Sequence, residues 1–277
     1  MATVNVDNWQ DFLTAAAVAG DTVNLPENAE WDIGELEPEG HSGAIILKAT
    51  INGNGTKIKN LVINDGTSDG IIQITATVTD LHFVDGVWPV NQYVVRFMAN
   101  DAIAQLCTFS ASIQGGSTVY LFGTSLIGQQ NKATVYRCAA NIEFATATNA
   151  WFHGYNTQGK YNNMKISGSR ITSVTVASTS SMNTNGKMEY SYMICDTPAV
   201  TTFTGAPCWW SLIRCTGSNV STLANVGDST GAKITLACSS DFPNAGTVSR
   251  GLSLCTESQL HDAAYLQSIG FPIGVEY

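Results

Sequence analysis

The chain has 277 residues, of which 44% are hydrophobic and 13% are charged, and its formal net charge at pH 7 is −9. This apolar fraction excludes a disordered chain, and the scarcity of Lys and Arg argues against nucleic-acid binding, which needs clustered basic side chains. No apolar run approaches the ~18 residues of a transmembrane helix, so we expect no membrane partner.

The negative charge is concentrated in the first part of the chain. Residues 1–101 hold nine Asp and five Glu against three Lys and one Arg, a net charge of −10, whereas the remainder carries +1. We expect these carboxylates to form a solvated rim, with a docking face for a basic partner as the alternative. Residues 1–7 have neither a basic region nor an apolar core, so we expect no secretory signal peptide.

Residues 8–19 predict a helix, because four apolar side chains recur at i, i+3, i+4 and i+7 spacing. These side chains are Trp9, Phe12, Leu13 and Ala16. Asp7 or Asn8 is the expected N-cap, and Gly20 is the expected stop.

Residues 21–255 predict a series of short strands rich in Val, Ile, Thr, Phe and Tyr, with Gly, Asn and Asp turns between them. The strands recur at intervals of roughly 19 to roughly 31 residues, which indicates the stacked coils of a solenoid. The alternative is an ordinary β fold with amphipathic helices packed against it.

The seven cysteines do not form a metal or redox motif. They are Cys107, Cys138, Cys195, Cys208, Cys215, Cys238 and Cys255. Their number is odd and no Cys-x-x-Cys pair occurs, so we expect buried, reduced thiols in a protein that folds in a reducing compartment. In five of the recurring segments a Cys takes a similar place, which predicts a ladder of small buried residues.

The C-terminal residues predict a second cap. Thr256 and Gln259 form a capping-box pattern before an expected helix over 257–269, which Gly270 and Pro272 end. An open solenoid needs such caps to cover the strand edges at its ends. We therefore expect one domain with an N-terminal capping helix at 1–20, a solenoid at 21–255, and a C-terminal helix and tail at 256–277.

Several segments resemble a known family. Residues 9–16, 20–25, 51–56 and 58–63 resemble the opening coils of right-handed parallel β-helix proteins, the pectate-lyase-like folds. The resemblance covers roughly residues 1–85 and implies an all-β, right-handed parallel β-helix. The family includes carbohydrate-active enzymes, bacterial surface proteins, and phage tailspikes and decoration proteins, so the fold alone does not define the function.

Residues 102–188, where such a family keeps its cleft, contain a single carboxylate, Glu143. A glycoside hydrolase needs two carboxylates ~5–9.5 Å apart, and a lyase of the pectate type needs several carboxylates for calcium and a basic residue. We therefore expect no enzyme activity and no cofactor.

Two other polar groups are candidates for chemistry. His82 with Asp80 and Asp85 could form an acid–base pair, but we expect a polar residue on the outer face of a coil. Asp65, Asp69, Asp80 and Asp85 could gather around calcium, but turn aspartates more often bond their own backbone, so we expect no metal.

Two aromatic clusters are candidate contact residues. Trp151, His153 and Tyr155 could form a sugar-stacking surface or pack on the solenoid flank. Trp209 and Trp210 are adjacent, and neighbouring residues of a strand face opposite sides, so we expect one of the two to point outward into a protein interface or glycan site.

The resemblance and the small number of candidate catalytic residues together predict a non-enzymatic structural component of a phage particle, such as a capsid decoration, head-fibre or tail-associated protein. We expect it to assemble in the host cytoplasm and to pack against other virion proteins as a homo-oligomer, with a trimer implied by the phage β-helices. The alternatives are a carbohydrate-active or host-glycan-binding spike and a bacterial adhesin.

Overall fold

The structure is a computed structural model, and it describes residues 1–65, 70–89, 92–99, 101–115, 118–124, 133–144, 149–153, 165–167, 170–176, 180–184, 187–189, 192–196, 200–205, 208–216, 222–224, 234–242 and 252–271. Only the backbone is described for strand residues between 149 and 209 and for a few others in this set. Within the described segments, no helix has the length and apolar character needed to cross a membrane.

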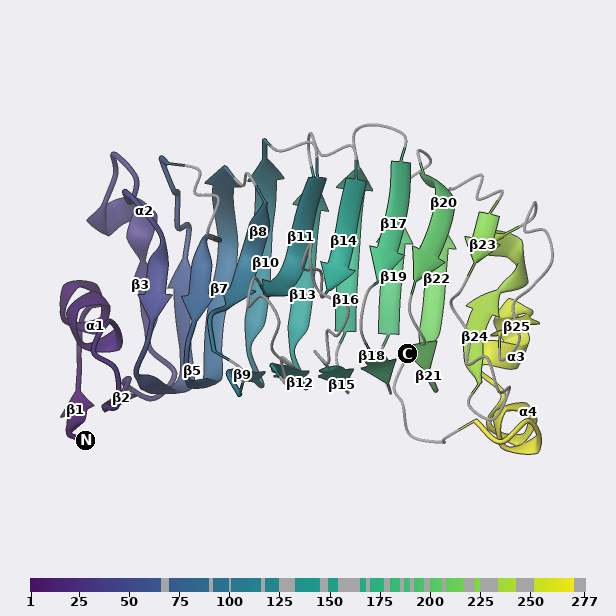
Figure 1. The fold of residues 1–277 in the computed structure, drawn as a ribbon, viewed down its shortest axis with the longest axis horizontal. Coiled ribbons are helices and arrows are strands. Elements are labelled where there is room, and N and C mark those ends of the chain that lie inside the picture. The colour runs from purple at the N-terminus through teal and green to yellow at the C-terminus, as the bar shows by residue number, and fades with distance from the viewer. Residues whose placement is uncertain are drawn as a thin grey trace.

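The strands stack side by side along the long axis of the molecule (Figure 1). Those of a 17-stranded sheet form two parallel ladders, which share the long strands β5 (Thr50–Lys59) and β7 (Thr77–Pro89). The first parts of β5 and β7 belong to the first ladder. Its other strands are β1 (Thr3–Asn5), β2 (Thr22–Asn24), β9 (Ile103–Gln105), β12 (Thr134–Tyr136), β15 (Lys165–Ser167), β18 (Lys187–Glu189) and β21 (Cys208–Trp209).

The second ladder contains the later parts of β5 and β7. Its other strands are β3 (Glu30–Asp32), β10 (Thr108–Gln114), β13 (Ala139–Phe144), β16 (Arg170–Val176), β19 (Tyr192–Asp196), β22 (Leu212–Thr216), β24 (Thr235–Cys238) and β25 (Leu252–Cys255).

An 8-stranded parallel sheet forms the third ladder. Its strands are β4 (Ile45–Leu47), β6 (Ile72–Ile74), β8 (Tyr93–Phe97), β11 (Thr118–Thr124), β14 (Asn149–His153), β17 (Ser180–Thr184), β20 (Val200–Gly205) and β23 (Thr222–Ala224). The expected all-β class with parallel strands and few helices is confirmed.

The chain turns from the first ladder to the second at a residue with positive φ. Four such corners have one residue of this kind each: Asp80 (φ 55°), Leu106 (φ 56°), Arg137 (φ 50°) and Trp210 (φ 46°). The left-handed conformation at the corner reverses the two-residue alternation of side chains. Whether a residue beyond the corner faces inward or outward therefore cannot be found by counting every second residue from the strand before it.

The hydrophobic core lies between the ladders and is built from alternate residues of the strands. The first ladder contributes Ile51, Val78, Ala104 and Val135, all essentially buried. In the second ladder the rings of Phe83 and Phe109 stack with centroids 6.1 Å apart. In-register stacking of like side chains on parallel strands repeats the same packing from one strand to the next.

The N-terminal helix is present where the sequence predicts it, although it ends earlier. α1 (Trp9–Ala16) begins after Asn8, whose side chain accepts a hydrogen bond from the Asp11 backbone N–H. Trp9, Phe12 and Ala16 are buried in the core, and the Ala16 carbonyl accepts bonds from the backbone N–H groups of residues 48 and 49. A further short helix, α2 (Ile33–Leu36), follows β3 and was not predicted.

The predicted single helix over 257–269 is wrong, because the chain forms two helices there. The capping box of Thr256 and Gln259 starts α3 (Glu257–Leu260) as expected. Asp262 then accepts hydrogen bonds from the next backbone N–H groups and starts α4 (Ala263–Ser268). Leu260 and Leu266 pack on a second hydrophobic cluster with Leu236, which covers this end of the second ladder.

Candidate functional site

Along β1, β2, β5, β7, β9 and β12, the outer side of the first ladder presents two columns of uncharged side chains, which we call the Thr/Asn face. Its described members are Thr3, Asn5, Thr22, Asn24, Thr50, Asn52, Thr77, Thr79, Ile103, Gln105, Thr134 and Tyr136. Each of these side chains is exposed or half-buried. The residue that lies between the two columns in each of these strands is apolar, and in every one of them after β1 it is fully buried. By register the columns continue into Lys165 of β15 and into Lys187 and Glu189 of β18, whose side chains are not described.

The regular register of the parallel strands builds this face. Thr3, Thr22 and Thr50 lie directly opposite one another, as do Asn5, Asn24 and Asn52. Along the Asn column, the Asn24 amide donates to Asn5 Oδ1 at 3.0 Å, and the Asn52 amide donates to Asn24 Oδ1 at 2.7 Å. These bonds hold the amides in a fixed row and leave further donors and acceptors directed outward.

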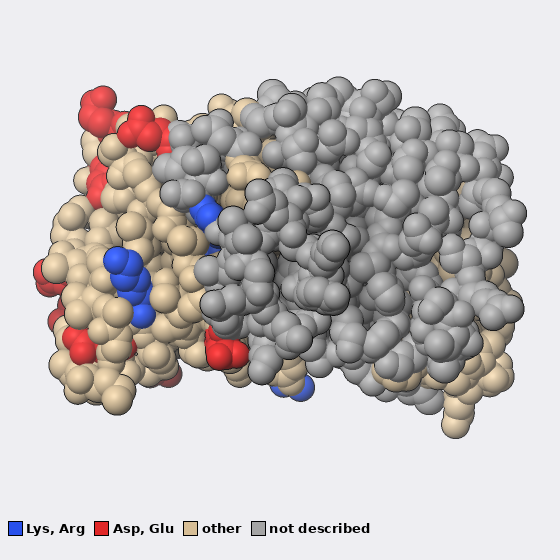
Figure 2. Space-filling view, in the orientation of Figure 1, with Lys and Arg blue, Asp and Glu red and all other residues tan. Residues whose placement is uncertain are grey.

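The Thr/Asn face differs from its surroundings in charge. None of its described side chains is Asp, Glu, Lys, Arg or His, although residues 1–101 carry a net charge of −10. The carboxylates of this region lie at separate places on the N-terminal part of the molecule, with basic side chains among them (Figure 2).

A groove of about 340 Å³ lies on the second ladder, across β7, β10 and β13. It is lined by Asp85, Gly86, Val87, Ser110, Ala111, Ser112, Asn141 and Glu143. A bulge in β7 forms its edge, because Asp85 has a φ of 55° and the register shifts between Phe109 and Ala111. Hydroxyls, an amide and carboxylates suit hydrogen bonding to a polyol.

The groove contains two carboxylates where the sequence indicated one. Glu143 lies in register with Ser112, which in turn lies in register with Val87, so Asp85 and Glu143 come from strands on opposite sides of β10. Because the two acids are far apart in the sequence, the sequence alone did not indicate that they line the same groove. Both side chains are exposed, so neither has the shielded position of a general acid.

His82 lies on the outer side of β7 as a half-buried polar residue, which is the interpretation favoured from the sequence. Its ring nitrogens contact Thr108 Oγ1 at 3.0 Å and Asp80 Oδ1 at 3.2 Å. Asp85 lines the groove instead. By register, His82 pairs with Thr108 of β10.

Of the four aspartates considered for calcium, the three that the structure describes do not gather at one place. The Asp65 carboxylate accepts from Ser42 Oγ at 2.6 Å, Asp80 contacts His82, and Asp69 lies outside the described residues. Among the described side chains, no group of three or more His, Cys, Asp or Glu residues could hold a metal ion.

The first aromatic candidates belong to the third ladder. Trp151 and His153 lie in β14, in register with Tyr120 and Phe122, and their own side chains are not described. The preceding members of the Trp151 column are Tyr93 and Tyr120, which are buried and stack with ring centroids 5.1 Å apart. Tyr155 lies outside the described residues.

The adjacent tryptophans are not successive residues of one strand. Trp209 ends β21, and Trp210 occupies the left-handed corner, where its half-buried side chain packs on the second hydrophobic cluster. The expectation that alternation places them on opposite sides therefore does not apply. By register, Trp209 follows Glu189 in the column of the first ladder that contains Asn52 and Tyr136.

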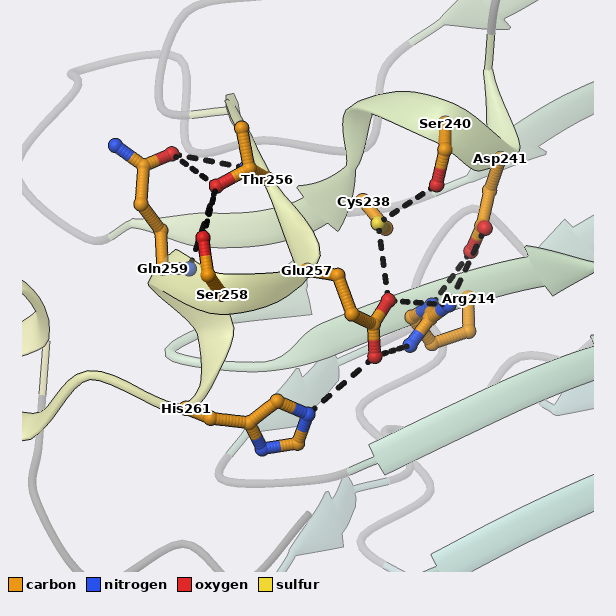
Figure 3. Close-up of polar contacts among 9 residues, drawn as sticks. All are labelled: Arg214, Cys238, Ser240, Asp241, Thr256, Glu257, Ser258, Gln259 and His261. Atoms are coloured by element: carbon orange, nitrogen blue, oxygen red, sulfur yellow. Dashed lines mark hydrogen bonds and ion pairs between the residues drawn. The ribbon is translucent and has the colours of Figure 1, made fainter.

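A partly buried ion-pair cluster fastens α3 to the second ladder (Figure 3). The Arg214 guanidinium on β22 donates to Asp241 of the 3-10 turn Ser239–Asp241 and to Glu257 at the start of α3. Asp241 raises the pKa of Arg214, and Arg214 lowers the pKa of Glu257. His261 Nε2 lies 3.3 Å from Glu257 Oε1. No sequence motif indicated this cluster.

A second cluster fastens the N-terminal cap. Glu37 Oε1 accepts hydrogen bonds from Trp9 Nε1 at 2.7 Å and from the Gln10 amide at 2.8 Å. Glu37 Oε2 lies 2.7 Å from His41 Nδ1. We interpret both clusters as structural, because each joins a terminal helix to the body of the molecule.

Comparison with known proteins gives no relative, since no family model, no curated protein and no solved structure matches the chain.

Proposed function

We propose that the chain is a right-handed parallel β-helix that serves as a non-enzymatic structural component of a phage particle, through protein–protein packing. The order of strands supports the β-helix, because β9, β10 and β11 belong to the first, second and third ladders, and β12, β13 and β14 repeat that order. A right-handed connection is the rule for parallel strands.

The Thr/Asn face is the observation that carries the packing role. Burying an ionised side chain in an interface without a partner is costly, whereas short polar side chains can be buried with their hydrogen bonds satisfied. In a chain of net charge −9, an uncharged face is the surface that another virion protein or a further copy can approach with least repulsion.

The proposal that the chain functions in a virion depends on its resemblance to phage β-helices in residues 1–85. Quantitative mass spectrometry of purified particles tests it, because a structural component must be present in a fixed ratio to the major capsid or tail protein. Recovery of the chain only from cells or culture supernatant would overturn the virion setting.

A second candidate function is glycan binding, favoured by the groove between Asp85 and Glu143. Titration calorimetry against host-surface oligosaccharides tests this candidate, with Asn141→Ala and Ser112→Ala as groove variants. Saturable binding that both variants weaken would favour the glycan-binding alternative. Release of oligosaccharide ends from a polysaccharide would show an enzyme and overturn the non-enzymatic proposal.

A further inference from the structure

The parallel register brings cysteines of neighbouring strands directly opposite one another. Cys195 on β19 pairs with Cys215 on β22, and Cys238 on β24 pairs with Cys255 on β25. Six of the seven cysteines belong to such pairs when Cys107 and Cys138 are included. The remaining one, Cys208, lies opposite Met188.

Cys107 and Cys138 form a pair at the corner between the first and second ladders. The strands before them pair Gln105 with Tyr136, and the strands after them pair Thr108 with Ala139, so the two cysteines lie opposite each other. Both are buried, and each thiol lies within hydrogen-bond distance of backbone carbonyls, Cys107 Sγ of Val78 and Gln105 and Cys138 Sγ of Ala104 and Tyr136. The interaction between the two thiols lowers the pKa of Cys107, and the same interaction, together with burial, raises the pKa of Cys138.

We propose that these three pairs are oxidation sites at which a low-molecular-weight disulfide, such as glutathione disulfide, links neighbouring strands as Cys107–Cys138, Cys195–Cys215 and Cys238–Cys255. Adjacent strands lie about 4.8 Å apart, which is inside the range of roughly 4.4–6.8 Å between the Cα atoms of a disulfide. The inference does not depend on the proposed function.

The exchange proceeds in two balanced steps at each pair. One cysteine thiolate, which at the corner is that of Cys107, attacks a sulfur of glutathione disulfide and releases one glutathione thiolate. The partner thiolate, that of Cys138, then attacks the Cys107 sulfur of the mixed disulfide and releases a second glutathione. The pair loses two protons and two electrons, and the oxidant accepts the electrons as it becomes two thiols.

The parallel geometry also makes the bonds easily reduced. Side chains of directly opposed residues point the same way, so their Cβ atoms remain about as far apart as the strands, beyond the ~3.8 Å typical of a disulfide. Closing the bond must shift the backbone locally, and strained disulfides have more oxidising potentials. The pairs therefore stay reduced where reduced glutathione is in excess, and they close where glutathione disulfide is in excess and local opening admits it.

The experiment exposes the folded full-length chain to glutathione disulfide in a urea concentration below the unfolding transition, where local opening admits the oxidant. Remaining thiols are blocked with an alkylating reagent, and the disulfide-linked peptides are identified by mass spectrometry. We expect the thiol count to fall from seven to one, with alkylation confined to Cys208.

The control is the Cys208→Ala variant, which should form the same three links and retain no thiol. Retention of all the thiols, or links that join other cysteines, would overturn the proposal. Full recovery of thiols in millimolar reduced glutathione is expected, and links that resist it would contradict the strained geometry.

Discussion

Arg214 and Asp241 form a two-point ion pair in which Nε lies 2.6 Å from Oδ2 and Nη2 lies 3.3 Å from Oδ1. The Asp241 side chain is 5% exposed and that of Arg214 is 15% exposed, so water screens this pair little. The same guanidinium reaches Glu257, with Nη2 2.9 Å from Oε2. One arginine therefore connects the second ladder to both the 3-10 turn and α3.

Replacing Asp241 with Ala should destabilise the protein, because it leaves the half-buried Arg214 without its buried carboxylate partner and with only the exposed Glu257 to pair with. We expect a loss of about 3–5 kcal/mol in the free energy of unfolding, measured by urea denaturation. The double variant Arg214→Met/Asp241→Leu is the control and should recover most of the loss. A single variant as stable as the wild type would contradict a structural role for the pair.

Glu257 should make the stability of the protein depend on pH in the acid range. Hydrogen bonds from Arg214 hold the pKa of Glu257 below its usual value of 4.5 in the folded protein. The stabilisation is therefore complete above pH 4.5 and is lost as pH falls through the folded pKa. Below pH 4.5 the urea midpoint of the wild type should fall more steeply than that of Glu257→Gln. Parallel curves would refute this linkage.

Glu37 should stabilise the N-terminal cap through the buried indole N–H of Trp9. Trp9 is 1% exposed, so Glu37→Ala leaves its Nε1 without the acceptor that it has in the wild type. We expect a cost of about 1–3 kcal/mol in the free energy of unfolding. Glu35→Ala, at an exposed position of α2, is the matched control and should change stability by less than about 0.5 kcal/mol. Equal effects of the two substitutions would contradict the role of Glu37.

Gly53 is required by close backbone packing. A Cβ atom at this position would clash with the carbonyl oxygen of Asp80, where the register between β5 and β7 shifts. Gly53→Ala should cost about 1–3 kcal/mol, because the obstacle is backbone and cannot rotate away. Gly34→Ala, whose nearest neighbour would be a side-chain atom at 3.3 Å, is the control. Thermal melts in which both variants match the wild type would show that β5 and β7 can separate at this point.

The sequence predicts the features that depend on local patterns. The apolar spacing of Trp9 and Phe12 identifies α1, and the Thr256 capping box identifies α3, because both signals lie within one or two helical turns. The recurrence of short strands also predicts the parallel all-β architecture. The second helical start at Asp262 was missed, because a single aspartate inside an apolar pattern gives no clear break signal.

Features that depend on register could not be predicted. The left-handed corners at Asp80 and Leu106 lie at matching places in neighbouring coils, since Thr79 pairs with Gln105 before them and His82 pairs with Thr108 after them. The proximity of Asp85 and Glu143 likewise depends on how strands far apart in sequence align. The Thr/Asn face was present in the sequence as a repeated Thr-x-Asn pattern, but only the pairing of β1, β2 and β5 shows that its members form columns.

The central claim, that the Thr/Asn face packs against other proteins of a particle, is tested most directly by competition for incorporation. Wild-type chain and the variant Thr50→Lys/Thr77→Lys are supplied together during assembly, and their ratio in purified particles is measured by mass spectrometry. Ile46→Lys, a charge on an exposed residue of the third ladder, is the control. The account predicts at least about a tenfold depletion of the Thr/Asn-face variant, which corresponds to roughly 1.4 kcal/mol, and equal incorporation of the control. Equal incorporation of all three folded chains would contradict it.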